Sequence, residues 1–532
     1  MSNPMAHDNR NQAGTAELKA DDLVPAFPYE GDFDTSRARP RTFASLQLRA
    51  KNALRALLHS SNSRALVLCG SSLVDQVKTA CTLVREQQGH TDNVVLAYAP
   101  TKFEFFGNDR ENGIITDKGI VIMPISHLNI HPKWLTMLDA VLAQNRDIRL
   151  ILCGDADDCA QLSVYWGNFF NQIQADLVLE FPSGDGFSLV ASLVKSYVDE
   201  YRLKEFDGEA IHLLCIYLAR ISGDRNWLYI PEQKLISLCT EAFTYCRGRL
   251  IGRRHVLRAI AASDFRINFL AESELRDHRD RQILIQTSGA VTGQINGLSV
   301  IATAGTAYEY GQPVRITATL RAGGEGDVID IERKAELAGQ IHAKAMMIIN
   351  GYLTKEFGSE QPLPVSASLV FEQSYSEIDG DSASLTGLCA VLSCLARLPI
   401  RQDLAVTGAV DQFGDVQAVG GVNEKIEGFF KVCKLHGLTG SQGVIIPSSC
   451  VSQLVLRPAV IEAVRKGRFH IYTAGHVTDA ICLLTGVPFG DAEAKDSVCG
   501  RIVTNLSEIA ENRPHQDLLF MNRVRNLLGL RS

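Results

Sequence analysis

The chain lacks several features that would place it at once in a broad class of protein. Its longest apolar runs, such as 65–69 and 388–395, are far shorter than the roughly 20 residues that a membrane-spanning helix needs. Its formal net charge is −7, so no basic excess favours a nucleic acid or an anionic membrane as partner. The first thirty residues contain no apolar core of a signal peptide. We therefore expect a cytoplasmic protein without nucleic-acid or membrane partners.

A cysteine pair of the kind that binds zinc is also absent. The 13 cysteines include no Cys-x-x-Cys, and most of them lie within apolar runs such as 67–69 and 213–215. Their odd number does not suit a framework of paired disulfides. We expect free thiols that pack as small apolar side chains, and no metal site.

The 532 residues, 46% of them hydrophobic, are enough for several domains with cores of their own. Residues 1–40 are polar and without periodicity, which predicts a flexible arm. From 41 to 204, short apolar runs alternate with helical stretches, which predicts a parallel α/β domain with strands near 64–69, 93–98, 119–123, 148–153 and 177–181. Residues 205–288 lose strand character and predict a helical domain with a linker. This succession resembles the plan of an AAA-type ATPase module with its lid.

The C-terminal part has a different pattern. Residues 289–490 mix alternating, glycine-punctuated strands with helices, which indicates an α+β domain. Predicted helices cover 333–351, 383–396, 424–436, 452–466 and 477–484. A polar tail follows at 491–532 and ends in an amphipathic helix at 518–530. The overall prediction is an α/β multidomain protein.

A polar segment between a predicted strand and a predicted helix holds the first candidate site residue. Residues 379–384 read Asp-Gly-Asp-Ser-Ala-Ser, turn on Gly380 and lead into a leucine-rich helix. Ser382 therefore lies near a helix start, where free N–H groups and the helix dipole stabilise negative charge. Taken alone, the segment favours an ordinary N-cap over a nucleophile for Ser382.

A second segment supplies a candidate base. Residues 419–425 read Val-Gly-Gly-Val-Asn-Glu-Lys, which indicates a strand end, a turn and a helix start with Asn423 as the N-cap. Lys425 would lie in the first turn, where the helix dipole disfavours its charge. If it were also buried, its pKa would fall further and the neutral amine could act as a general base. Without further context, a solvated surface lysine is the simpler interpretation.

Together the two segments resemble the signature segments of the Lon protease domain. The resemblance rests on 379–384, on Thr407-Gly408 and on 420–425, and the 43 positions from Ser382 to Lys425 are similar to the spacing of the family's serine–lysine dyad. Similar stretches at 293–300, 339–344 and 443–447 extend the likeness over about 290–490. The Gly-Asp-Ser form resembles the B-type branch. Residues 330–337 and 371–377 look like bacterial Lon-related proteases with a shortened, divergent ATPase region.

The resemblance implies roles for five residues. Ser382 would be the nucleophile and Lys425 the general base of a serine endopeptidase, with an oxyanion hole near Asp381–Ser382. Thr407 is a candidate to orient the lysine amine, although an ordinary strand threonine fits equally well. Asp379 and Asp381 flank the serine, and neither is assigned as a triad acid. The resemblance also implies unfolded or tagged protein substrates and a homo-oligomeric ring, a hexamer by analogy.

The nucleotide-binding motif of such a module is degenerate. After the strand at 64–69, the loop begins at Gly70, but the glycine, lysine and hydroxyl positions of Gly-x-x-x-x-Gly-Lys-[Ser/Thr] hold Asp75, Gln76 and Val77. Lys78 comes two positions late, and the strand at 119–123 ends without acidic residues. We therefore expect no ATP hydrolysis and no cofactor for peptide-bond chemistry, although the resemblance allows ATP binding.

Two functions remain open on the sequence. The first is an active serine–lysine endopeptidase. The second is a catalytically silent Lon-like scaffold, adaptor or regulatory protein. Acylation of Ser382 by a serine-reactive probe separates them.

Overall fold

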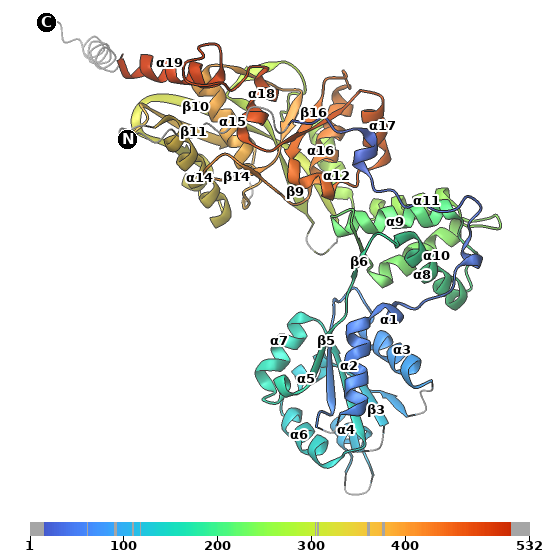
Figure 1. Cartoon of the computed structure of the whole chain (residues 1–532). Helices are drawn as coiled ribbons and strands as arrows, with labels where there is room; N and C mark the ends of the chain where they lie inside the picture. The colour runs from blue at the N-terminus through green and yellow to red at the C-terminus, as the bar shows by residue number, and fades with distance from the viewer. Residues whose placement is uncertain are drawn as a thin grey trace, which may run out of the picture. The chain divides into compact units, whose positions relative to one another are not determined.

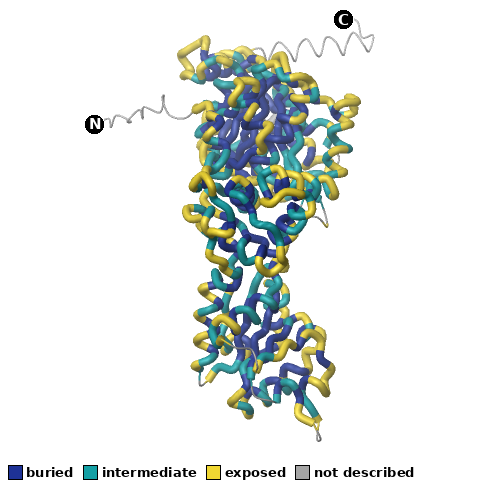
Figure 2. Tube along the Cα trace, turned by 90° about the vertical axis from the view of Figure 1, so that its right-hand side faces the viewer, coloured by how far each residue is buried: buried dark blue, intermediate teal, exposed yellow. Residues whose placement is uncertain are grey.

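The computed structural model describes residues 15–511 except for short gaps at 61, 90–92, 109–110, 117–118, 304, 306–307, 359–361 and 375–377, and except for the side chains of 324–325. The chain forms two compact units (Figure 1). The C-terminal unit comprises Met1–Pro25, Gly223–Arg225 and Asp264–Ser532, and the N-terminal unit comprises Ala26–Ser222 and Asn226–Ser263. In each unit the buried segments, dark blue in Figure 2, run through the interior.

A parallel sheet forms the centre of the N-terminal unit. Its strand order is β2-β3-β4-β1-β5, and every neighbouring pair is parallel. The strands are β1 (Ala65–Cys69), β2 (Val94–Leu96), β3 (Gly119–Pro124), β4 (Ile148–Gly154) and β5 (Ile173–Asp176). The central strands are apolar on both faces, as expected where helices cover both sides of a sheet.

Helices cover both faces of this sheet (Figure 1). Leu66 and Leu68 pack with α2 and α3, while Val67 points to the opposite face and packs with α5, α6 and α7. This alternation is the two-residue period of a strand. The helices are α1 (Phe43–Leu46), α2 (Leu48–His59), α3 (Gln76–Gln88), α4 (Lys102–Phe106), α5 (Ile125–Ile130), α6 (Trp134–Gln144) and α7 (Ala156–Tyr165). The predicted parallel α/β arrangement is confirmed.

Four longer helices complete the N-terminal unit, namely α8 (Gly186–Tyr201), α9 (Gly208–Ser222), α10 (Glu232–Tyr245) and α11 (Arg253–Phe265). The predicted strand at 177–181 is wrong, because the chain leaves the parallel sheet after Asp176. Instead β6 (Glu180–Pro182) pairs antiparallel with β7 (Trp227–Tyr229) in a separate two-stranded sheet. These helices and the parallel sheet form one compact unit, so the structure does not separate a helical domain from the sheet. A separate helical domain at 205–288 stays a prediction.

The C-terminal unit contains a six-stranded mixed sheet in the order β11-β10-β9-β13-β16-β17. β10 runs antiparallel to β9 and β11, and the other neighbouring pairs are parallel. The strands of this unit are β8 (Ala290–Thr292), β9 (Gln294–Ala302), β10 (Glu309–Asp330), β11 (Val365–Phe371), β12 (Pro399–Arg401), β13 (Leu404–Val406), β14 (Ala409–Val410), β15 (Val416–Gln417), β16 (Gly443–Pro447) and β17 (His470–Ala474).

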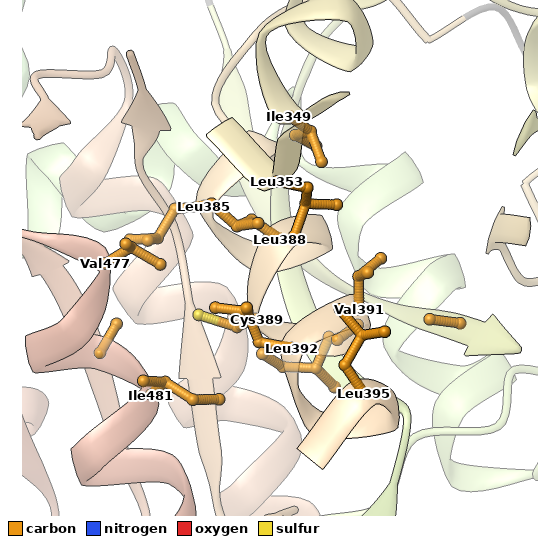
Figure 3. Packing of buried hydrophobic residues seen from close by; sticks show 14 of the residues in the cluster. Ile349, Leu353, Leu385, Leu388, Cys389, Val391, Leu392, Leu395, Val477 and Ile481 are labelled. Atoms are coloured by element: carbon orange, nitrogen blue, oxygen red, sulfur yellow. The ribbon is translucent and has the colours of Figure 1, made fainter. Parts of the chain in front are cut away.

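The core of this unit surrounds α15 (Ser384–Ala396), in which every residue except Cys394 is buried. Figure 3 shows its leucines packed beside Ile349 and Leu353 of α14 and beside Val477 and Ile481 of α18. A second cluster on α16 and α17 covers the other side of the sheet. The helices are α12 (Phe269–Arg279), α13 (Ile331–Lys334), α14 (Gln340–Phe357), α15, α16 (Val422–His436), α17 (Pro458–Arg465), α18 (Val477–Thr485) and α19 (Val498–Glu511). The mixed α+β prediction for this region is confirmed.

Two terminal predictions need correction. The predicted flexible arm is wrong for 15–40, since Leu18 N–H donates to the Ile471 carbonyl (2.8 Å) beside β17 and Leu23 is fully buried. The predicted polar tail is wrong up to residue 511, because α19 buries Ile502 and Leu506 against the core. Residues 1–14 and the predicted helix at 518–530 lie outside the described residues.

The predicted helix at 333–351 is divided in two. α13 ends at Lys334, Glu336 takes a left-handed conformation (φ 59°), and α14 begins only at Gln340. Since a left-handed residue cannot continue a right-handed helix, the break follows from that residue. None of the described helices is long and apolar enough to cross a membrane.

Candidate active site

Ser382 lies in the loop just before α15. The N-cap of α15 is Ala383, which makes no side-chain capping bond, so Ser382 is not the N-cap that the segment alone favoured. The side chain is partly exposed, whereas the helix that follows it is buried. Ser384 N–H donates to the Asp381 carbonyl (2.9 Å), which closes a tight turn around the serine.

The segment between β13 and β14 holds this loop from the other side. Gly408 N–H donates to the Ser382 carbonyl (2.9 Å), and the Gly408 carbonyl accepts from Leu385 N–H (3.1 Å). A Cβ atom at position 408 would lie 2.8 Å from Leu385 Cδ2, so the Leu385 side chain would have to shift to admit a larger residue. Thr407 is fully buried, and its Oγ1 donates to the Ser382 carbonyl (3.3 Å). Thr407 therefore contacts the backbone of Ser382, the candidate nucleophile.

Lys425 lies in the first turn of α16 and is 3% exposed. The backbone reason for this placement is Gly421, the N-cap, which has φ 63° and accepts from Lys425 N–H (3.0 Å). The helix also approaches β10 very closely, since a Cβ at Gly311 would lie 2.0 Å from the Glu424 carbonyl oxygen. This backbone contact covers the side of the first turn that faces β10.

The environment of Lys425 favours the neutral amine. Burial lowers its pKa from the ordinary 10.5 to about 8, against smaller opposing effects of Cys450 and Asp381. Because Asp381 affects the pKa of Lys425, the lysine lies within electrostatic range of this residue, which precedes Ser382. The prediction of a lowered lysine pKa is therefore supported, while the surface-lysine interpretation is wrong.

The two aspartates that flank Gly380 have different surroundings. Asp379 Oδ1 accepts from the backbone N–H groups of Ile341 (3.0 Å) and His342 (3.3 Å), at the start of α14. Asp381 is exposed and acts on Lys425 through space. Asp379 thus holds a helix start, and only Asp381 interacts with the lysine.

Backbone N–H groups at the loop are open. Those of Ser382 and Ala383 donate to no acceptor among the described residues, in contrast to Ser384 N–H. Open N–H groups before a helix are donors for a developing oxyanion.

Sequence reasoning gave Asn423 the wrong role and missed Cys450, two residues near Lys425. Asn423 is not the N-cap; its amide donates to the Gln453 carbonyl (2.8 Å) and accepts from Val455 N–H (2.8 Å), which clamps α16 to the segment after β16. Cys450, in that segment, is fully buried. Burial raises the pKa of its thiol, and Lys425 partly opposes this. No local pattern marks Cys450, because it reaches the site from another element.

The Gly70 loop in the N-terminal unit is closed by its own side chains. Asp75 is the N-cap of α3 and accepts from Lys78 N–H (2.8 Å), while Gln76 Nε2 donates to the Gly70 carbonyl (3.0 Å). Lys78 Nζ donates to Glu200 Oε1 (2.7 Å) on α8. The carboxylate at the helix start and the absent loop lysine do not fit a nucleotide phosphate.

The cavity beside this loop is also unsuited to a phosphate group. It measures about 560 Å³ and lies at the carboxyl ends of β1, β4 and β5, where parallel sheets commonly bind ligands. Its charged lining residues are Asp155, Asp157, Asp176 and Glu180. Four carboxylates without a basic residue in the lining repel an anionic phosphate chain. The described residues contain no group of three or more His, Cys, Asp or Glu placed to hold a metal ion.

Comparison with known proteins finds a similarity within the C-terminal unit. Residues 375–477 match the family model of the Lon protease (S16) C-terminal proteolytic domain. A Lon protease homolog of Escherichia coli (strain K12) is 44% identical over 293 residues, 55% of this chain and 50% of the relative. A Lon protease homolog of Haemophilus influenzae is 39% identical over 352 residues, 64% of this chain and 57% of the relative.

A more distant relative is the archaeal Lon protease of Pyrococcus abyssi, which is 30% identical over 274 residues, 51% of this chain and 26% of the relative. The chain spans about half the length of the two bacterial relatives. The matched segment 375–477 contains both Ser382 and Lys425. Over the matched residues, the chain is therefore similar to Lon-related proteases.

Proposed function

We propose that this chain is a serine endopeptidase of the Lon type that cleaves unfolded or damaged proteins and peptides with Ser382 as nucleophile and Lys425 as general base. The observation that carries the proposal is the burial of Lys425, which lowers its pKa to about 8 beside the residue that precedes Ser382. A lysine with this pKa is neutral in about a tenth of the molecules at pH 7, enough to accept a proton from a serine hydroxyl.

The proposed reaction has two halves. In the first, Ser382 Oγ attacks the peptide carbonyl carbon while Lys425 takes the hydroxyl proton and passes it to the leaving amine. In the second, Lys425 takes a proton from water, whose hydroxide attacks the acyl-enzyme ester, and the proton returns to Ser382 Oγ. The open N–H groups of Ser382 and Ala383 are our candidates for the oxyanion hole.

Thr407 and the aspartates have supporting roles in this proposal. Thr407 holds the Ser382 carbonyl, and so fixes the backbone of the nucleophile rather than the lysine amine. The negative charge of Asp381 offsets part of the effect of burial on Lys425 and so keeps the lysine's pKa from falling still lower. Neither aspartate is proposed as a triad acid.

Covalent labelling tests the nucleophile. A fluorophosphonate probe is expected to add one equivalent to the wild type at Ser382, located by mass spectrometry, and none to Ser382→Ala. Ser448→Ala is the matched control, because Ser448 is an exposed serine of the same unit and its loss should leave labelling unchanged. Equal labelling of Ser382→Ala and the wild type would refute the proposed nucleophile.

We further propose that cleavage needs no ATP. Asp75, the diverted Lys78 and the acidic cavity support this, because none of them offers a phosphate site. Casein and short peptides should be degraded equally with and without ATP, and a stable folded domain should resist in both conditions. ATP-dependent loss of the folded domain would contradict the proposal.

The proposed assembly is a homo-oligomeric ring, a hexamer by family resemblance. Sedimentation velocity at micromolar concentration is expected to give a species of about six chains. A stable monomer that still cleaves casein would show that the ring is not required.

The alternative is a catalytically silent scaffold or adaptor with the same fold. It is favoured if the folded wild type neither accepts the probe nor cleaves casein at any pH between 7 and 9.5. The lowered pKa of Lys425 is the observation against it, because a scaffold gains nothing from an isolated buried lysine.

A further inference from the structure

A buried histidine–aspartate pair lies close to the loop that leads to Ser382. His342 Nε2 is 3.2 Å from Asp330 Oδ2, and the two side chains are 3% and 6% exposed. Neither atom forms a well-aligned hydrogen bond within the described residues, with the other or with any third group, so their 3.2 Å approach is an electrostatic contact. Because a buried ionic group without its partner is costly, each residue holds the other in place.

The pair joins the ends of three elements. Asp330 is the last residue of β10 and the N-cap of α13, where its Oδ1 accepts from Glu332 N–H (3.1 Å). His342 lies in the first turn of α14, and its ring packs edge-on against Phe371 at the end of β11 (centroids 5.3 Å apart). Glu332 Oε1 in turn accepts from Phe371 N–H (3.1 Å). The start of α14 is thereby fastened to the sheet.

The charge state of the pair is consistent with this role. Burial by itself would raise the pKa of Asp330, but His342 and the backbone N–H groups of Arg333 and Glu332 outweigh it and bring the pKa below its ordinary value. The carboxylate is therefore ionised at neutral pH and available to His342 as an acceptor.

The start of α14 also holds the loop before Ser382. Besides the two N–H groups of Ile341 and His342 that donate to Asp379, Gly339 N–H donates to the Ile378 carbonyl (2.9 Å) and Ile378 N–H donates to the Leu337 carbonyl (2.8 Å). A Cβ at Gly339 would lie 2.3 Å from Asp379 Cγ, which shows how closely the two segments approach. Ser382 follows Asp379 by three residues.

We propose that Asp330 and His342 are positioning residues of the active site: they fix the first turn of α14, which holds Asp379 and so sets the position of Ser382 relative to Lys425. This inference rests on the proposed function. Both side chains are buried, so their proposed role is indirect. A displacement of the nucleophile by about 1 Å costs up to about 100-fold in rate, so a loosened pair affects catalysis without removing any reacting group.

Three variants test the pair in a peptide-cleavage assay on folded protein, well below its unfolding temperature. Asp330→Asn and His342→Leu should lower kcat by about 10- to 100-fold with KM changed less than about twofold. His342→Gln should keep most of the activity, because its side-chain amide can donate where imidazole Nε2 does. A purely structural pair would lower the unfolding temperature and leave kcat unchanged in all three.

Asp403→Asn is the matched control. Asp403 is also buried and ion-paired, with bonds of 3.0 and 2.8 Å from Arg401, but it lies between β12 and β13 and makes no contact with the loop before Ser382 among the described residues. This variant should lose stability and keep its kcat. An equal fall of kcat in Asp403→Asn and Asp330→Asn would overturn the positioning role.

Hydrogen exchange separates this inference from the proposed function, since it needs no activity. In Asp330→Asn and His342→Leu, the amides of 378–384 should exchange at least about tenfold faster than in the wild type, with 404–406 unchanged. Unchanged exchange at 378–384 in the folded variants overturns the inference. Faster exchange together with an inactive, unlabelled wild type would refute the peptidase and still support the link between the pair and the loop.

Discussion

Two helix starts in this molecule have opposite chemistry. At α3, the Asp75 carboxylate already accepts from the helix backbone (2.8 Å), and Gln76 fills the Gly70 loop. At α15, Ala383 makes no side-chain cap, and the N–H groups of Ser382 and Ala383 have no acceptor among the described residues. A helix start can serve an anion or an oxyanion only where the chain's own side chains leave its donors open. By this criterion α15 qualifies and α3 does not.

Two first-turn lysines differ in the same way. Burial lowers the pKa of Lys78, but its bonds to Glu200 and Tyr201 outweigh this and the pKa rises above 10.5. Burial lowers the pKa of Lys425 to about 8, because Cys450 and Asp381 oppose it only weakly. An ion-paired lysine keeps its proton, whereas an isolated buried one can release it at neutral pH. The difference lies in the partners and not in the residue type.

The largest expected effect comes from the dyad. Ser382→Ala and Lys425→Ala should each lower kcat/KM by at least about 10³- to 10⁴-fold, and the double variant should be no worse, because the pair acts as a unit. Lys425→Arg should be equally inactive, since a guanidinium cannot lose its proton. Lys78→Ala is the matched control and should keep full peptidase activity. Substantial activity in Lys425→Arg would contradict the general-base role.

The next largest expected effect is the change of peptide cleavage with pH. Because the neutral amine is the proposed active form, kcat/KM should rise with pH and level off above the lysine's pKa of about 8, with a tenfold fall per pH unit well below it. Peptide cleavage measured from pH 6 to 9.5 checks this. A limb centred near 10.4 would mean that Lys425 is solvated in the active enzyme.

Replacing Lys425 should change stability in the opposite direction from activity. Since the folded pKa of Lys425 is lowered, the lysine's contribution to stability is present above its unfolded pKa and is lost as pH falls through about 8. Lys425→Met should therefore stabilise the fold at pH 7 by on the order of 2 kcal/mol, and the gain should vanish near pH 11. Urea unfolding at the two pH values measures it. Lys78→Met, which removes a half-exposed ion pair, should destabilise by less than about 1 kcal/mol. A destabilised Lys425→Met at pH 7 would show that the lysine is paired after all.

The smallest expected effect concerns α3, the helix that Asp75 caps. Asp75→Ala should lower stability by about 1 kcal/mol through loss of the N-cap and leave peptide cleavage unchanged. Thr101→Ala, which removes the N-cap of α4 in the same unit, is the control for a simple capping effect. Isothermal titration should detect no ATP binding to either variant. Tight ATP binding by Asp75→Ala would show that this carboxylate alone excludes the nucleotide.

Local patterns predicted much of the fold. The apolar runs at β1, β3 and β4, the leucine spacing of α15 and the Gly-Gly turn before α16 are short-range signals, and the structure confirms each element close to its predicted limits. The strand at 177–181 failed because a run of apolar residues does not show which sheet it joins. The helix at 333–351 failed at Glu336, whose left-handed backbone has no sequence signature.

Features that depend on distant segments were not predictable. The segment 15–25 looks polar and irregular, yet it pairs with β17 at the other end of the sequence. Asn423 was an expected N-cap, but its amide binds backbone groups 30 and 32 residues away. Cys450 and the Asp330–His342 pair belong to the same class, because each acquires its surroundings only when separate elements meet.

By itself, the sequence determined the two segments around Ser382 and Lys425, their spacing and the loss of the phosphate-binding pattern at Gly70, because these depend on neighbouring residues in the chain. Only the tertiary structure decided that Lys425 is buried and has no ion pair among the described residues, while Lys78 is bound by Glu200. The physical reason is that a side chain's pKa depends on burial and on charges that the fold brings from elsewhere. Two lysines in similar local positions therefore reach opposite protonation behaviour.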